Sequence, residues 1–161
     1  MRIRGVLVVF GAFAVASSLS AQTKIAGTAT CKGDTIPPVE VGDSPGHTLS
    51  VQKANCTWTG LEIEGSPAKE GVSVATGEAH GNSGSSRGYH TGTMANGDHW
   101  TCSFQGRSTS KDGKPVGDSG TWAFTNGTGK LKGIKGKGTF KGTPAADGTM
   151  TYKIEGEYSL P

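Results

Sequence analysis

The sequence predicts an all-β fold, a single antiparallel barrel of about eight strands, on three observations. Glycine accounts for 27 of the 161 residues, and glycine is costly inside helices but useful at turns, bulges and barrel corners. No stretch after residue 21 sustains the 3.6-residue periodicity of an amphipathic helix. Short runs that alternate apolar and polar residues recur instead, separated by Gly, Asn, Asp, Ser and Pro.

Residues 1–21 have the composition of a secretory signal peptide. Arg2 and Arg4 precede the apolar run Val6–Val15, and small residues follow as far as Ala21. The apolar run is too short to cross a bilayer as a helix. We therefore expect cleavage after Ala21, a single barrel domain over residues 22–161, and a secreted or periplasmic protein without a membrane span.

Alternation and turn residues predict five strands in the first two thirds of the chain: Lys24–Thr30, Thr48–Trp58, Gly71–His80, Arg87–Met94 and His99–Ser108. A long loop with three prolines is expected over Lys32–Gly46, and Gly81–Ser86 and Lys111–Gly117 are expected to be flexible or turning. Leu49 and Val51 are out of phase with Cys56 and Trp58, so a bulge is expected near Asn55 to Thr59.

The segment Gly120–Gly142 predicts a β-hairpin at the centre of the fold. Trp122 and Phe124 share one face of its first strand, and Asn126–Gly127 is expected to turn the chain. Leu131 is out of phase with Ile134 on the return, which predicts a bulge near Gly133.

The last strand has the clearest pattern. One face carries Met150, Tyr152, Ile154, Gly156, Tyr158 and Leu160. We expect this strand to close the barrel against an early strand and so remove the exposed edges.

Part of the hairpin resembles a known family. The sequence NGTGKLKGIKGKGTF over residues 126–140 is similar to the glycine-rich signature of the allene oxide cyclase and dirigent-protein barrels. The resemblance covers residues 120–142, and the rest of the chain matches only in rhythm. It implies an eight-stranded antiparallel barrel whose lumen holds a small hydrophobic ligand, and it does not imply the cyclase reaction.

The three cysteines allow at most one bridge within the chain. We expect Cys31–Cys56, because this bridge would hold the long proline-containing loop. Cys102 lies between Trp100 and Phe104 on the expected inner face, where it is either a buried thiol that fills the core or a nucleophile in the lumen.

A lumen would be lined by the inward aromatic residues. The wall candidates are Trp100, Phe104, Trp122, Phe124, Phe140, Tyr152 and Tyr158. Glu78 and His80 share parity with Val72 and Val74, so they point into the barrel near one end if the valines face the core. There they would form a polar anchor for a ligand or an acid/base pair; the alternative is that both side chains lie in solvent.

Other signals are weak. Lys130, Lys132, Lys135, Lys137 and Lys141 form a basic stripe without aromatic partners, so we expect a solubilising surface and no nucleic-acid partner. No metal site is expected, because the four histidines show no ligand spacing such as His-x-x-x-His, and no cofactor motif is present.

Three functions remain open from the sequence. The first is a secreted barrel that binds a small hydrophobic or aromatic molecule in its lumen. The second is an enzyme of the cyclase or dirigent type that acts on a hydrophobic substrate. The third is a structural or surface protein whose barrel is filled by its own side chains.

Overall fold

The computed structural model describes residues 22–34 and 36–161, so the expected signal peptide lies outside the described residues. The fold is all-β, as predicted, and the only helical segment in the described part is the short 3₁₀ turn η1, Gly129–Leu131. The strands are β1 Thr23–Gly33, β2 Val39–Glu40, β3 His47–Thr59, β4 Glu62–Ile63, β5 Ser66–His80, β6 Ser83–Met94, β7 His99–Lys111, β8 Lys114–Gly127, β9 Lys135–Pro144 and β10 Met150–Ser159.

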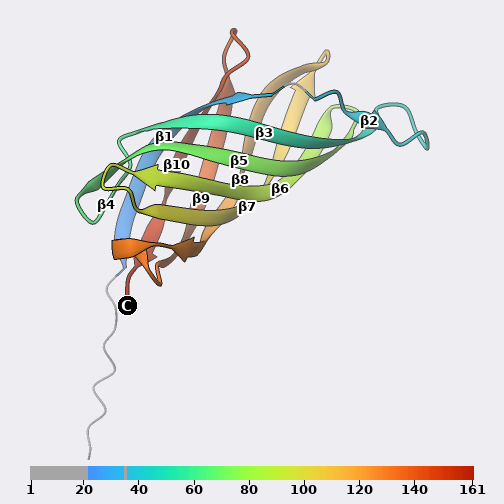
Figure 1. Cartoon of the computed structure of the whole chain (residues 1–161). Coiled ribbons are helices and arrows are strands. Elements are labelled where there is room, and N and C mark those ends of the chain that lie inside the picture. Colours follow the sequence, from blue (N-terminus) through green and yellow to red (C-terminus); the bar gives the residue numbers. More distant parts are fainter. Residues whose placement is uncertain (1–21, 35) are drawn as a thin grey trace, which may run out of the picture.

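Eight of these strands close into an antiparallel barrel (Figure 1). The order around it is β1-β3-β5-β6-β7-β8-β9-β10, and β10 returns to β1. Thr23 pairs with Tyr158 and Cys31 with Met150, which confirms that the last strand closes the barrel against the first. The short strands β2 and β4 lie near opposite ends of the barrel (Figure 1). No helix in the described residues is long and apolar enough to cross a membrane.

Large aromatic rings fill much of the interior by lying over glycines of neighbouring strands. A methyl group on Gly138 or on Gly156 would approach within 2.7 Å of the Trp122 ring, and one on Gly106 or Gly120 would come equally close to the Phe140 ring. These inward positions therefore have to lack a side chain, because an aromatic ring one or two strands away occupies the space, and at Gly120, Gly138 and Gly156 a backbone carbonyl oxygen lies closer still.

The predicted hairpin is present, but its turn differs. Asp118 to Ala123 of β8 pair with residues 137–142 of β9. The chain does not reverse at Asn126–Gly127: β8 continues to Gly127, and η1 and residues 132–134 connect it to β9. This connection buries both Leu131 and Ile134, so the change of phase comes from the 3₁₀ turn and not from a bulge.

Two further expectations about β3 and β5 are wrong. β3 keeps continuous register with both neighbours through Asn55 to Thr57, so the expected bulge is absent there, and Leu49 and Val51 are simply half exposed. On β5, Val72 and Val74 also face outward, with exposed fractions of 36% and 49%. The inner face of β5 carries small residues such as Ser73 and Ala75, because bulky rings from other strands occupy the lumen.

Strands β6, β7 and β8 are longer than expected. The segments Gly81–Ser86 and Lys111–Gly117 contribute mostly to strands, and only two residues separate β6 from β5 and β8 from β7. Glycines with positive φ at 81 and 113 make these tight turns possible.

Candidate ligand site in the barrel lumen

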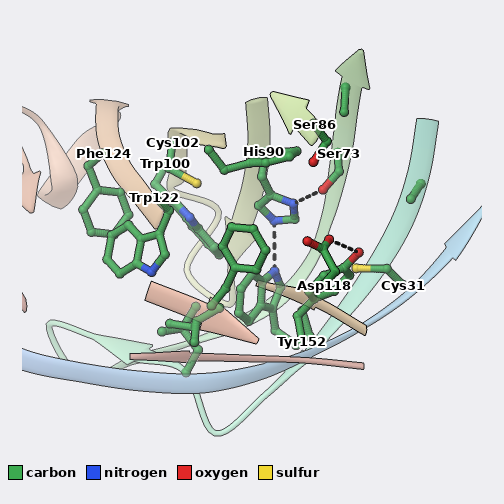
Figure 2. A pocket seen from close by; sticks show the side chains of 18 of the residues that line it. Cys31, Ser73, Ser86, His90, Trp100, Cys102, Asp118, Trp122, Phe124 and Tyr152 are labelled. Atoms are coloured by element: carbon green, nitrogen blue, oxygen red, sulfur yellow. Dashed lines mark hydrogen bonds between the residues drawn. The ribbon is translucent and has the colours of Figure 1, made fainter. Parts of the chain in front are cut away.

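The barrel interior contains a partly open cavity of about 150 Å³, lined by residues of all eight long strands. The predicted wall residues Trp100, Phe104, Trp122, Phe124, Phe140 and Tyr152 all line it. In Figure 2, the rings of Phe124, Trp122 and Trp100 lie on one side of His90, and Ser73, Ser86, Asp118 and Tyr152 lie on the other. Tyr158 belongs to the core but does not line this cavity. The lumen therefore combines an apolar wall with a polar one.

The polar wall is organised around His90 of β6. The Trp58 indole Nε1–H donates to His90 Nε2 over 3.1 Å, and His90 Nδ1 lies 2.8 Å from Ser73 Oγ (Figure 2). Indole nitrogen only donates, so His90 Nε2 must be an acceptor and the ring proton lies on Nδ1. Burial lowers the pKa of His90 to about 4. His90 is thus a neutral side chain with a fixed tautomer.

This tautomer limits the chemistry that Ser73 can perform. Activation of a serine requires a neighbouring nitrogen that accepts its proton. The nitrogen facing Ser73 carries the ring proton, and the other nitrogen is occupied by Trp58. Ser73 therefore accepts a hydrogen bond from His90 and keeps its own hydroxyl proton. This arrangement suits recognition of a ligand and does not form a nucleophile–base pair.

Asp118 of β8 is the second polar group of the lumen. The Tyr152 hydroxyl donates to Asp118 Oδ2 over 3.4 Å, whereas the buried Oδ1 has no hydrogen-bond partner in the described part of the chain. Burial raises the pKa of this carboxyl, and burial together with the Asp118 charge raises that of Tyr152. An unpartnered buried acceptor is costly, which makes Oδ1 available to a donor brought by a ligand.

The positions of the three cysteines indicate structural roles. Cys31 and Cys56 form the predicted disulfide across β1 and β3. Cys102 is buried beside the lumen, and burial raises the pKa of its thiol to about 12. A thiol with so high a pKa is not a nucleophile at neutral pH.

Glu78 and His80 do not lie in the lumen. They are on the outer face of β5 with Val72 and Val74, where their side chains are 49% and 60% exposed. Glu78 Oε1 lies 3.0 Å from His47 Nε2 and 3.4 Å from His80 Nε2, and His47 Nδ1 lies 2.6 Å from Asp43. The Asp43 hydrogen bond raises the pKa of His47, and the His47 hydrogen bond lowers that of Glu78. The parity argument failed because it assumed that valines mark the inner face.

His90 and Asp118 were not among the predicted wall or anchor residues of the lumen. His90 has the same parity as the buried Met94 on its strand, which was a usable signal. Asp118 fell between the expected turn Lys111–Gly117 and the expected hairpin Gly120–Gly142, so nothing suggested that it faces inward. The lysines at 135, 137 and 141 are exposed on β9.

Comparisons with known proteins identify the fold alone. No family model matches the chain, and no curated protein matches it. Among solved structures, the chain is similar to a protein of unknown function from the DUF3224 family of Shewanella oneidensis MR-1. The TM-score is 0.52 at 16% sequence identity, and the match covers 88% of this chain and 99% of that one. No finding links the chain specifically to allene oxide cyclases or dirigent proteins. The chain is an antiparallel barrel with a structural neighbour of unknown function.

Proposed function

We propose that this barrel is a secreted or periplasmic binding protein whose lumen holds a small, mostly apolar molecule with one hydrogen-bond donor. The observation that carries the proposal is the buried, unpartnered Oδ1 of Asp118, a residue that lines a largely apolar cavity. A side-chain-filled barrel gains nothing from a buried acceptor without a donor, whereas a ligand hydroxyl or amine would satisfy it.

The size of the cavity restricts the ligand. Dry protein cavities of roughly 150 Å³ accommodate a benzene-sized molecule. A volume of about 150 Å³ here therefore favours a single ring or a short branched chain over an extended substrate. The aromatic wall supplies edge-to-face and stacking partners for such a ring.

The polar groups favour binding over catalysis. His90 is neutral and held on both ring nitrogens, and the Cys102 thiol is protonated. Neither group is prepared to accept a proton from a substrate at neutral pH.

Export is supported by the disulfide. Bridges such as Cys31–Cys56 persist in oxidising compartments and are rare in the cytosol. The signal-peptide-like composition of residues 1–21 points to the same compartment.

Phenol and toluene provide a matched pair of probes, since they are of similar size but only phenol donates a hydrogen bond. We expect phenol to bind more tightly to the wild-type protein, by about fivefold, because a hydrogen bond contributes about 1 kcal/mol. Asp118→Leu removes the acceptor and should abolish this preference while leaving toluene binding in place. Fluorescence of Trp58, Trp100 and Trp122, which line the cavity, would report binding, and calorimetry would give the affinities.

The surface lysines give a control. Replacing Lys135, Lys137 and Lys141 together by Gln should leave the affinity for both probes unchanged, because these exposed side chains lie outside the lumen. If neither probe binds the wild type, the barrel is filled and its role is structural. If the lysine changes alone abolish binding, the ligand is anionic and binds outside.

A further inference from the structure

The outer face of the barrel carries a cluster of imidazole and carboxylate groups at one end. His47 begins β3 and His80 ends β5, and these two residues are direct partners across the antiparallel ladder. Glu78 lies two residues before His80 and therefore on the same face of β5. Asp43 precedes β3 in the loop that follows β2 (Figure 1). The pairing of β3 with β5 thus brings together residues that are more than 30 positions apart in sequence.

The donor atoms converge on a small volume. One oxygen of Glu78, Oε1, lies 3.0 Å from His47 Nε2 and 3.4 Å from His80 Nε2. One ligand atom from each of the three side chains lies within 4.8 Å of the others. Zinc–nitrogen bonds of about 2.0–2.1 Å in a tetrahedron place ligand atoms about 3.4 Å apart. Two of the three separations are already close to this value, and the exposed His80 side chain is free to adjust the third.

Asp43 holds His47 in the orientation that such a site needs. Its carboxylate lies 2.6 Å from His47 Nδ1, so this ring nitrogen carries a proton that it donates to Asp43. Metal-binding histidines commonly donate their second ring N–H to a carboxylate, which fixes the tautomer and directs the other nitrogen to the ion. His47 is also held by stacking on His80, with ring centroids 3.9 Å apart. The His47 side chain is only 11% exposed, which further restricts its orientation.

We propose that His47, Glu78 and His80 form a binding site for a divalent transition metal, of which Zn²⁺ fits best, with Asp43 as the positioning residue for His47. Two imidazoles and one carboxylate favour Zn²⁺ over Mg²⁺ or Ca²⁺, which prefer oxygen ligands. The two carboxylates together balance the charge of a divalent ion. Exposure of Glu78 and His80 leaves a fourth position open to water or to a ligand from outside.

The absence of a metal motif in the sequence has a simple cause. The ligands come from two strands that meet only when β3 pairs with β5, so no local spacing marks them. The site is also separate from the lumen, since neither Glu78 nor His80 lines the cavity. Metal binding and binding of a small molecule in the lumen can therefore be tested independently.

The test is a calorimetric titration of the purified, chelator-treated protein with ZnCl₂, repeated with CoCl₂ to record the visible absorption of the bound ion. We expect one ion per chain and a higher Tm with Zn²⁺ present, because an ion that binds only the folded state stabilises it. Glu78→Gln and His80→Gln should each weaken binding by at least about tenfold, and Asp43→Ala should weaken it by about 10–100-fold. His99→Gln is the matched control, because His99 is an exposed histidine whose Nδ1 lies 3.2 Å from Thr93 Oγ1 and whose backbone N–H donates to Thr128 Oγ1.

Three results would overturn the proposal. The first is the absence of saturable binding to the wild-type protein. The second is wild-type affinity in the double variant Glu78→Gln/His80→Gln. The third is an equal loss of affinity in His99→Gln, which would indicate scattered binding to surface histidines. The far-ultraviolet circular dichroism of each variant verifies that the barrel is intact, and Asp43→Glu, which restores the carboxylate, should recover part of the affinity lost in Asp43→Ala.

Discussion

Protonation of His90 should destabilise the barrel in acid. The pKa of His90 is about 4 in the folded protein, against an ordinary value of 6.5. Between these values the unfolded chain binds more protons than the folded one, so the free energy of unfolding decreases as the pH falls from 6.5 to 4. The difference corresponds to about 3 kcal/mol, reached with a slope of at most about 1.4 kcal/mol per pH unit. The physical cause is the burial of the imidazole, and a protonated Nε2 would in addition face the Trp58 N–H donor.

The assay is urea unfolding followed by tryptophan fluorescence at several pH values between 4 and 7. His90→Gln is expected to be less stable than the wild type at pH 7 by about 1–3 kcal/mol, because Trp58 and Ser73 lose their partner. This difference should shrink by about 3 kcal/mol, or change sign, as the pH approaches 4, since only the wild type has the buried imidazole. Other groups, including Asp118, titrate in both proteins and cancel in the comparison. A difference that stays constant with pH would show that His90 is not held neutral, and His99→Gln, which changes an exposed histidine, should leave the profile unchanged.

Three further outcomes follow from the packing and the cysteines. Gly138→Ala should lower the free energy of unfolding by about 1–3 kcal/mol, because its methyl group would clash with the Glu155 carbonyl oxygen and the Trp122 ring. Gly33→Ala, with only ordinary contacts, should cost little, and equal effects in urea unfolding would contradict this account. Replacing Cys31 and Cys56 together by Ser should cost about 2–4 kcal/mol, measured in the same assay against the wild type, and no loss would mean that the bridge does not constrain the unfolded chain. Cys102 should resist thiol reagents until the protein unfolds, because it is buried and the pKa of its thiol is about 12; rapid labelling of the native protein would exclude this environment.

The sequence was sufficient to predict the architecture and much of the lumen. Alternation in the last strand located its inner face, and Tyr152, Ile154 and Leu160 do pack against the core. Odd cysteine number and loop position were enough to predict the Cys31–Cys56 bridge. These predictions succeeded because strands reveal their faces wherever large apolar residues alternate strictly with polar ones.

The alternation of apolar and polar residues did not predict which face of β5 lies inside the barrel. A closed barrel of this size has a limited interior, and rings from β3, β7, β8 and β9 occupy much of it. The strand opposite them must present small residues inward, so Ser73 and Ala75 face the lumen while Val74 faces solvent. Hydrophobicity alone assigns the inner and outer faces of such a strand the wrong way round. The volume of a side chain, and not its polarity, decides whether it fits into the lumen. The burial of Asp118 also results from the packing of side chains in the lumen, so the sequence pattern did not predict it.

The pairing of β1 with β10 imposes an order on folding. Thr23 cannot meet Tyr158 until the last strand is available, so barrel closure is a contact of very long sequence separation. Until then β1 has an unpaired edge, which is the kind of surface that aggregates. The Cys31–Cys56 bridge attaches β1 to β3, whose pairing is much closer in sequence. Oxidation before closure would therefore keep β1 docked on one side while it waits for β10, so refolding from the reduced state should be slower and more prone to aggregation.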